Sequence, residues 1–188
     1  MKILITGATG FVGSHLTKAL LKYKSNHLIL LIRKSSNLSK IQEVIDKNNS
    51  RVNIIFGDLN DYGALLNATK DIDIVFHTAA LLGSPDITYK QIYIANVLGT
   101  KNLVEASEIN KVKRFVHISS VAVYGPIKYK NGNPINEETK CKPLTDYDKT
   151  KSLSEVVVTD SSLNWTIIRP TMVFGPRETT NKAKMFQL

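Results

Sequence analysis

The chain alternates between short apolar runs and longer segments whose apolar residues recur at helical spacing. The runs are rich in β-branched residues and almost continuously apolar, as expected of strands that are buried on both faces of a sheet. They cover residues 2–6, 27–33, 52–56, 73–77, 114–118 and 165–169. Between them, apolar residues three or four positions apart predict amphipathic helices. The four helical stripes are Val12, Leu16, Ala19, Leu20 and Tyr23; Ile41, Val44 and Ile45; Ile92, Ala95, Leu98, Leu103 and Ala106; and Leu153, Val156 and Val157.

This order of strands and helices predicts parallel strands joined by right-handed crossovers, and therefore a doubly wound α/β sheet with helices on both faces. Ligands of such sheets bind beyond the carboxyl ends of the strands, so the residues that follow each strand are the candidates for function. The segment 126–146 departs from the pattern. Its Asn, Gly and Pro residues predict a long loop, and a loop of about twenty residues inside a compact domain is usually functional.

The composition is that of an ordinary globular protein. With 188 residues, 43% hydrophobic and 22% charged, the chain is long enough for one domain, or for one and part of another, and disordered and fibrous classes are excluded. The longest apolar run, 28–32, is too short to span a membrane, and the N-terminus lacks the layout of a signal peptide. Cys141 is the only cysteine, which favours a reducing compartment. We therefore expect a cytoplasmic protein without a membrane partner or a metal site.

The charge balance raises the question of nucleic acid binding. The 25 Lys and Arg residues exceed the 16 Asp and Glu residues, and the net charge is +9. The basic residues are scattered, however, and no aromatic residues interleave with them as a stacking platform for bases would require. We expect no nucleic acid partner, and a lysine-rich surface with some attraction for small anionic molecules.

Three glycines follow the first predicted strand. Gly7, Gly10 and Gly13 are spaced three apart at the junction with the first helical stripe. The first glycine allows a tight turn, the second lets the backbone approach a pyrophosphate, and the third lets the helix pack closely on the sheet. The free N–H groups at the start of the helix favour an anion. This arrangement predicts that the turn binds the phosphates of a dinucleotide.

The end of the second strand bears on which dinucleotide is bound. NAD-preferring sites place an Asp or Glu there for the ribose 2′-hydroxyl, whereas this chain has Arg33 followed by Lys34. A carboxylate would repel a 2′-phosphate, and an arginine can hold one with two hydrogen bonds. The sequence therefore favours NADP(H) over NAD. The alternative is that Arg33 and Lys34 are surface charges at a strand end.

A second group of residues could carry acid–base chemistry. Ser120 follows the fifth strand, and Tyr147 and Lys151 are four apart, so that a helix places them on one face. An ammonium near the tyrosine hydroxyl would favour the phenolate, and Tyr147 could then exchange a proton beside a nicotinamide that exchanges hydride. Ser120 would hydrogen-bond the same substrate oxygen. By itself, a Tyr-x-x-x-Lys pair could also lie on the surface without a role.

From residue 2 to about residue 177, the sequence resembles the extended short-chain dehydrogenases/reductases, also called the NAD-dependent epimerase/dehydratase family. The motifs that carry the resemblance occur in family order at 6–13 (TGATGFVG), 57–59 (GDL), 77–80 (HTAA), 96–100 (NVLGT), 119–125 (SSVAVYG), 147–151 (YDKTK) and 169–176 (RPTMVFGP). The resemblance implies a Rossmann-type sheet. It also implies a homodimer formed through the helices around 91–108 and 147–160.

The resemblance assigns roles to individual residues. It implies that Ser120 is the catalytic hydroxyl, Tyr147 the acid/base, Lys151 its partner, and Asn96 a support for the lysine. The cofactor-binding residues would be Gly7, Thr9, Gly10, Phe11, Val12, Gly13, Arg33, Asp58, Leu59, Ala79, Ala80, Tyr147, Lys151 and Pro170. We further expect His77, Trp165 and Phe174 to be packed in the core.

Two features depart from the family pattern. Val121 and Ala122 replace the acidic pair of the 4,6-dehydratases, which counts against that reaction. The chain also ends soon after the sixth strand, so we expect a dinucleotide-binding domain at 1–177 and, at 178–188, the start of a C-terminal substrate lobe that is largely absent. The expected function is hydride transfer between a nicotinamide and a carbinol or ketone carbon, in a reductase or a nucleotide-sugar epimerase. The alternative is a non-catalytic dinucleotide-binding module or an inactive fragment.

Overall fold

The computed structural model describes residues 1–126 and 134–176, which contain one parallel sheet of six strands in the order β3-β2-β1-β4-β5-β6. The strands are β1 (Lys2–Thr6), β2 (His27–Ile32), β3 (Val52–Phe56), β4 (Ile74–His77), β5 (Arg114–Ile118) and β6 (Trp165–Ile168). All six predicted strands are confirmed, each to within one residue of its expected bounds. The strand order reverses between β1 and β4, where a doubly wound sheet opens a crevice for a ligand. The segment 178–188, predicted to begin a substrate lobe, lies outside the described residues.

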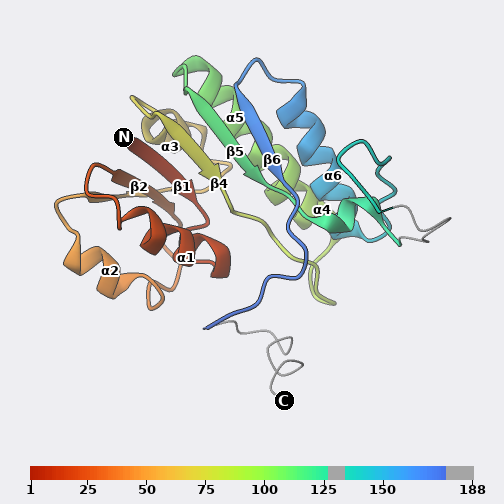
Figure 1. Ribbon diagram of the computed structural model, residues 1–188, viewed down its shortest axis with the longest axis horizontal. Coiled ribbons are helices and arrows are strands. Elements are labelled where there is room, and N and C mark those ends of the chain that lie inside the picture. The colour runs from red at the N-terminus through yellow and green to blue at the C-terminus, as the bar shows by residue number, and fades with distance from the viewer. Residues whose placement is uncertain (127–133, 177–188) are drawn as a thin grey trace.

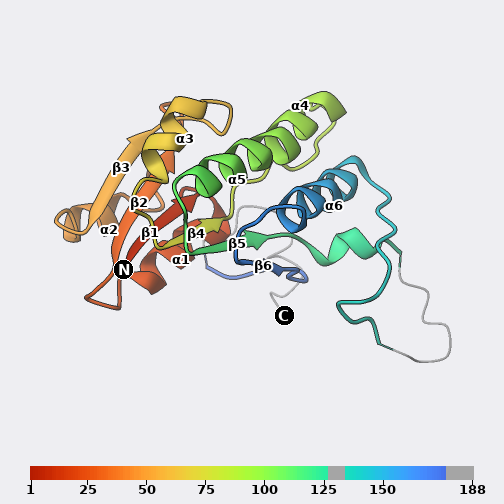
Figure 2. The same ribbon diagram turned by 90° about the horizontal axis from the view of Figure 1, so that it is seen from above.

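Helices cover both faces of the sheet, as predicted. They are α1 (Phe11–Leu20), α2 (Gln42–Lys47), α3 (Tyr62–Ala68), α4 (Tyr89–Tyr93), a π-helix (Ile94–Leu98), α5 (Gly99–Ile109), a 3₁₀ helix (Val121–Tyr124) and α6 (Asp146–Thr159). Helices α1 and α2 lie on one face, and α3, α5 and α6 on the other (Figures 1 and 2). Among the described helices, none has the length and the apolar character needed to cross a membrane.

Two apolar cores lie on opposite faces of the sheet. Leu4 of β1 packs toward α3, α5 and α6, together with Phe115 of β5 and Leu103 of α5. Ile3 and Ile5, its neighbours in the same strand, pack on the other face toward α1 and α2. Because successive side chains of a strand point to opposite faces, both faces of β1 need apolar residues. This explains why the predicted strands are continuously apolar instead of alternating.

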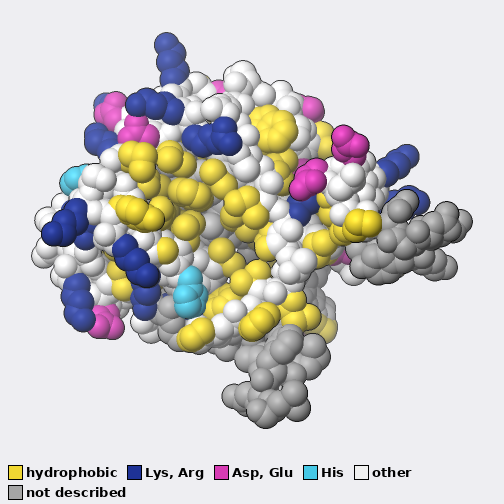
Figure 3. All heavy atoms as spheres, in the orientation of Figure 1, with side chains coloured by type: hydrophobic (Ala, Val, Ile, Leu, Met, Phe, Trp, Pro, Cys, Tyr) yellow, Lys and Arg dark blue, Asp and Glu magenta, His cyan; other side chains and the backbone are white. Residues whose placement is uncertain are grey.

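The half of the sheet formed by β4, β5 and β6 carries no described helix on the face covered by α1 and α2 (Figure 1). Apolar side chains gather on this side of the molecule (Figure 3), and Ile168 of β6 is 44% exposed. Trp165 and Phe174, which we expected in the core, are 39% and 57% exposed, so that expectation is wrong. Trp165 lies on the edge strand β6, and Phe174 follows the last strand, which leaves each with few covering elements.

In α1 and α6, the face that the helix buries differs from its apolar stripe. An apolar stripe ordinarily faces the core, yet Leu153 and Val156 of α6 are exposed. The residues that α6 buries are mostly polar: Asp148, Thr150, Lys151, Ser154, Glu155 and Val158. Helix α1 likewise buries Gly13, Ser14 and Thr17, which are small enough to let it approach the sheet closely. The stripes therefore predicted that these segments are helical, but not how they are oriented.

Candidate active site

The turn between β1 and α1 presses glycine backbone against the end of β4. Gly7 has φ +72°, and a Cβ atom on it would lie 2.6 Å from the backbone nitrogen of Ala79. A Cβ atom on Gly13 would lie 2.2 Å from the carbonyl oxygen of Gly7. Helix α1 begins at Gly10, which has no side chain to cap the first N–H groups. The turn therefore has the close approach and the open helix start that suit a phosphate group.

A cavity of about 250 Å³ opens at this turn, beyond the carboxyl ends of β1, β2, β3 and β4. It brings together eight residues that the sequence predicted for the cofactor: Gly7, Thr9, Gly10, Arg33, Asp58, Leu59, Ala79 and Ala80. Of the other predicted residues, Phe11, Val12 and Gly13 form the first turn of α1 beside the cavity, and Pro170 follows β6. The prediction missed Ser36, Gly57, Thr78, Leu81 and Ala95, which also line it.

Two charged residues mark the part of this cavity next to β2 and β3. Arg33 is exposed and directly follows β2. Asp58 follows β3, and its Oδ1 accepts hydrogen bonds from the backbone and the side-chain amide of Asn60, at 3.0 and 2.9 Å. Among the described residues that line the cavity, Asp58 is the one carboxylate. Ser36 is close to Arg33 because its backbone N–H donates to the Arg33 carbonyl at 2.9 Å, a turn that the Ser35-Ser36-Asn37 sequence could have suggested.

Ser120 and Tyr147 line a second cavity, of about 640 Å³. Consecutive residues of the loop after β4 line the two cavities: Leu81 lines the first and Leu82 the second. The second cavity has an apolar lining at Leu82, Ile87, Ile92 and Ala122, and a polar one at Ser84, Thr145 and Asp146. The loop after β4 thus contributes to both the lining of the proposed cofactor site and the lining of the cavity that holds Ser120 and Tyr147.

The position of Ser120 is fixed on both sides by the backbone. The N–H of Ser119 donates to the carbonyl of Ile168 at 2.7 Å, and the N–H of Val121 donates to the carbonyl of Pro170 at 3.0 Å. The Oγ of Ser120 accepts from the N–H of Ala122 at 3.1 Å, at the start of the 3₁₀ helix. Since the oxygen is used as an acceptor there, the hydroxyl proton can be donated into the cavity.

Lys151 and Tyr147 lie on one side of α6 but do not share a hydrogen bond within the described structure. Lys151 Nζ donates to the carbonyl of Ile118 at 2.8 Å, and burial lowers its pKa to about 8. Burial raises the pKa of the Tyr147 hydroxyl, and the Asp148 carboxylate raises it further. The expected stabilisation of the phenolate by Lys151 is therefore not found in the described structure, because the ammonium is directed to the end of β5.

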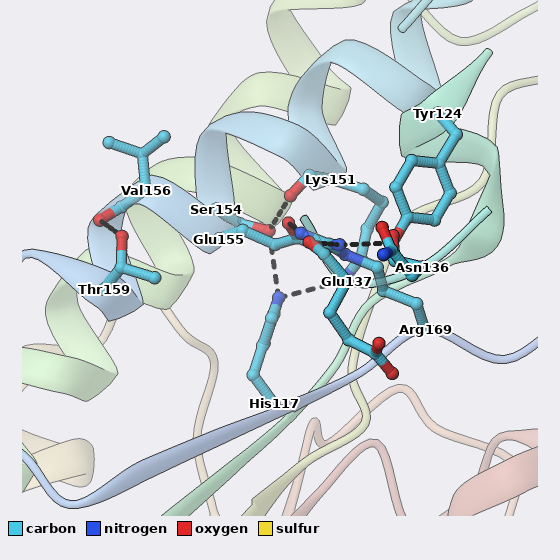
Figure 4. Close-up of polar contacts among 10 residues, drawn as sticks. All are labelled: His117, Tyr124, Asn136, Glu137, Lys151, Ser154, Glu155, Val156, Thr159 and Arg169. Atoms are coloured by element: carbon cyan, nitrogen blue, oxygen red, sulfur yellow. Dashed lines mark hydrogen bonds and ion pairs between the residues drawn. The ribbon is translucent and has the colours of Figure 1, made fainter. Parts of the chain in front are cut away.

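Two histidines lie side by side behind Lys151, with ring centroids 5.2 Å apart. Nε2 of His117 lies 3.0 Å from the Oγ of Ser154 and 3.3 Å from Nζ of Lys151 (Figure 4). Burial and the charge of Lys151 lower the pKa of His117 well below the ordinary value, so His117 is neutral. His77 is fully buried, and burial lowers its pKa to about 3. His77 is a packed core residue, as predicted. Within the described chain, no three His, Cys, Asp or Glu side chains form a group that could hold a metal ion.

Asn96 is turned inward by the π-helix and connects two elements of the site. Its Oδ1 accepts from the N–H of Leu81 at 2.7 Å, and its Nδ2 donates to the carbonyl of Leu81 at 3.0 Å and to the Oγ1 of Thr150 at 3.1 Å. Asn96 thus holds the loop after β4 against α6. Its contact on α6 is with Thr150, the residue that precedes Lys151, the lysine that Asn96 is expected to support.

The sequence matches a known family along nearly its whole length. Residues 3–188 match the family model described as the NAD dependent epimerase/dehydratase family. The chain belongs to this family. The family resemblance expected from the motifs is thereby confirmed, and so is the Rossmann-type fold, since solved epimerases share it.

Individual relatives cover most of this chain but only part of their own. The chain is 30% identical over 179 residues to sterol demethylase protein B of Methylococcus capsulatus and 32% identical over 197 residues to a UDP-glucose 4-epimerase of Vibrio cholerae. These matches cover 94% and 99% of this chain and 52% and 56% of the relatives, so the chain spans about half their length. A crystal structure of UDP-glucuronic acid 4-epimerase from Bacillus cereus in complex with NAD matches with a TM-score of 0.79 and 34% identity, over 95% of this chain and 59% of that one.

Proposed function

We propose that this chain is the cofactor-binding part of a nicotinamide-dependent oxidoreductase that transfers hydride to or from a carbinol or ketone carbon. The observation that carries the proposal is that the loop after β4 lines both a cavity at the glycine turn, through Leu81, and a cavity with Ser120 and Tyr147, through Leu82. In this proposal, residues 1–177 form the dinucleotide-binding domain and 178–188 begin the substrate lobe. A reducing, cytoplasmic setting belongs to the same proposal, on the basis of the single Cys141.

The residues at and near the second cavity would have separate roles in proton transfer. The bound nicotinamide would supply or accept the hydride. Ser120 donates its hydroxyl proton to the substrate oxygen and orients it, since the Ser120 oxygen is already held by Ala122. Tyr147 gives a proton to that oxygen during reduction and takes one from it during oxidation. Lys151 supplies a buried positive charge behind Tyr147 and would donate a hydrogen bond to the bound cofactor.

We propose NADP(H) as the preferred cofactor, with NAD as the alternative. Arg33 supports this choice, because it stands exposed at the cavity where NAD-preferring sites carry a carboxylate. The NAD complexes of the solved relatives support a nicotinamide dinucleotide in general. Arg33→Asp should weaken NADPH binding at least about tenfold while sparing NADH, because it replaces an attractive charge with a repulsive one. Lys34→Gln is the matched control and should change neither affinity by more than about twofold.

Two reactions remain within the proposal. A reductase releases its cofactor after each turnover and favours NADP(H). Arg33 supports a reductase because it favours NADP(H). A nucleotide-sugar epimerase retains its cofactor, and relatives such as UDP-glucose 4-epimerase favour that one. Cofactor that stays bound to the purified protein would support the epimerase, and cofactor-free protein would support the reductase. Nucleotide sugars are the first class of substrate to screen, followed by other small carbinols and ketones.

We also propose a homodimer. Leu98 at the end of the π-helix and Leu153 and Val156 of α6 are 39%, 40% and 51% exposed, although each belongs to a predicted apolar stripe. Pairing of these helices with those of a second copy would bury them. Leu153→Glu should convert the dimer to a monomer in sedimentation velocity, whereas Tyr23→Glu, at an exposed position after α1, should leave the dimer intact. A wild-type chain that sediments as a monomer at high concentration would remove this part of the proposal.

A titration of the purified chain with NADPH and with NADH, followed by nicotinamide fluorescence, tests the proposed cofactor site directly. We expect saturable binding of both, with NADPH bound more tightly. Saturable binding that Gly13→Ala abolishes would place the ligand at the glycine turn. Binding of neither dinucleotide by a folded chain would contradict the proposal that this chain binds the cofactor by itself.

A further inference from the structure

Arg169 makes the most extensive set of side-chain contacts near the site, and none of its partners was predicted from the sequence. Its Nε donates to Oε1 of Glu155 at 3.0 Å, and its Nη2 donates to Oε2 of Glu155 at 2.7 Å (Figure 4). Its Nη1 donates to the hydroxyl of Tyr124 at 2.6 Å, and the guanidinium lies 4.9 Å from the centre of the Tyr124 ring. The side chains of Arg169 and Glu155 are 22% and 7% exposed. This is a largely buried, two-pronged ion pair of the geometry that only arginine can make.

The ion pair connects the elements that carry the proposed chemistry. Glu155 lies one helical turn after Lys151 on the buried face of α6. Tyr124 ends the 3₁₀ helix that begins after Ser120, and its hydroxyl donates to the carbonyl of Asn136 at 2.9 Å. Arg169 itself directly precedes Pro170. The ion pair therefore joins α6 to the strand ends that hold Ser120, and it also fastens the long loop.

Charge gives the pair a second role, because Lys151 is buried close to it. The groups that face Lys151 are His117 of β5, His77 of β4, and Tyr147, Asp148 and Glu155 of its own helix. Both histidines are neutral, and the Asp148 carboxylate is engaged at the start of α6, where it accepts from the N–H of Thr145 at 3.0 Å. Glu155 acts on Lys151 through its charge, and Arg169 sets how much of that charge remains.

We propose that Arg169 and Glu155 are positioning residues for the hydride-transfer site: their ion pair locks α6 to the strand end that holds Ser120 and balances the charge that acts on Lys151. This inference rests on the proposed function, because it takes Lys151 as a ligand of the cofactor. An ion pair with a purely structural role would contribute to stability alone. The two roles differ in the pH dependence of cofactor binding: removing one member of the pair shifts the midpoint of that dependence only if the pair tunes the charge of Lys151.

The test is the affinity for NADPH between about pH 6.5 and pH 10, measured by nicotinamide fluorescence. The affinity of the wild-type chain for NADPH should fall with rising pH as Lys151 loses its charge, and the pH at which half of this fall has occurred is the midpoint. Lys151→Met should show no such fall and therefore no midpoint. Arg169→Met leaves the Glu155 carboxylate uncompensated and should raise the midpoint by about one pH unit. Glu155→Gln leaves the Arg169 charge uncompensated and should lower the midpoint by about half a unit or more. The double variant should return to within about 0.3 unit of wild type.

Controls separate this effect from a loss of structure. Circular dichroism checks folding, because an unpaired buried charge is strongly destabilising. If Arg169→Met does not fold, Glu155→Gln decides by itself: a lowered midpoint supports the inference, and an unmoved one overturns it. Glu43→Gln, in the exposed pair with Lys47, should leave the midpoint unchanged.

The possible outcomes distinguish this inference from the proposed function. A wild-type chain that binds neither NADPH nor NADH contradicts the proposed function itself. If the Arg169 and Glu155 variants keep the wild-type midpoint of the pH dependence and bind NADPH equally more weakly at every pH, only the positioning role is overturned.

Discussion

The hydroxyl of Thr6 lies 2.7 Å from Nδ1 of His77, which joins the carboxyl ends of β1 and β4 directly beneath the glycine turn. On the other side of the ring, Nε2 of His77 donates to the Oγ1 of Thr100 at 2.9 Å, because that hydroxyl donates its own proton to the carbonyl of Asn96 at 2.5 Å. A single neutral histidine thus links the turn that we propose binds phosphate to the π-helix that presents Asn96.

Replacing this histidine should weaken both stability and cofactor binding. We expect His77→Leu to lower the free energy of unfolding by about 2–4 kcal/mol, because it removes two buried hydrogen bonds and leaves the Thr6 hydroxyl without an acceptor. Urea denaturation measures the change, and NADPH titration measures its effect on the turn. His27→Gln, at an exposed position, should change the unfolding free energy by less than about 0.5 kcal/mol. Equal stabilities of His77→Leu and wild type would contradict the proposed link.

The buried histidines predict a specific sensitivity to acid. The pKa of His77 is about 3 in the folded chain, below the ordinary value of 6.5, and that of His117 is lowered in the same direction. Between these values the unfolded chain binds protons that the folded chain does not, so stability falls as the pH is lowered through this range. We expect a loss of about 2 kcal/mol per histidine between about pH 7 and pH 5, measured by urea denaturation. His77→Leu should show about half of this loss. If the unfolding free energy of His77→Leu changes with pH as steeply as that of the wild type, His77 is not a buried neutral histidine.

The close approach at the glycine turn can be tested with two glycine-to-alanine substitutions. Gly13→Ala places a Cβ atom 2.2 Å from the Gly7 carbonyl oxygen, which is backbone and cannot move aside cheaply. We expect NADPH affinity to fall by about 100-fold or more and the unfolding free energy to fall by about 2 kcal/mol or more. Gly63→Ala in α3 is the control, because its Cβ atom would meet only Asp61 Oδ1, at 3.6 Å. That change should stabilise the chain by about 0.5–1 kcal/mol.

Tyr147 should be required for turnover but not for binding. We expect Tyr147→Phe to reduce the rate of any hydride transfer by about 1,000-fold or more, since it removes the proton donor. NADPH affinity should stay within about threefold of wild type, because the hydroxyl has no hydrogen bond within the described structure. Tyr62→Phe, at the start of α3, is the control: α3 lies on the same face as α6, but Tyr62 lines neither cavity, so both quantities should stay unchanged. A collapse of NADPH binding in Tyr147→Phe would show that this tyrosine holds the cofactor instead of moving a proton.

The sequence predicts the sheet and the glycine turn because both depend on local signals. Each strand is a continuous apolar run, and the spacing of Gly7, Gly10 and Gly13 is contained in seven residues. The four-residue spacing of Tyr147 and Lys151 likewise sufficed to place them on one side of α6.

The rest of the site depends on contacts between distant elements. The π-helix shifts the helical register, so that Asn96 and Val97 are buried and Leu98 is exposed, and no local pattern marks that shift. The polar side of α6 is buried because its partners, such as Tyr124 and Arg169, come from other segments. One signal was available: Glu155 follows Lys151 by four residues, as Lys151 follows Tyr147, which places all three on one helical face.

The buried polar face of α6 makes the same side chains responsible for packing and for the proposed chemistry. Lys151 is the clearest case, because its lowered pKa means that the fold tolerates the ammonium only at a cost in stability. Exchange for a neutral side chain of similar length, such as methionine, relieves that cost while it removes the charge. Evolution or laboratory selection for heat resistance alone would therefore drive this helix toward inactivity. A lysine at position 151 would then indicate that the chain has been selected for activity.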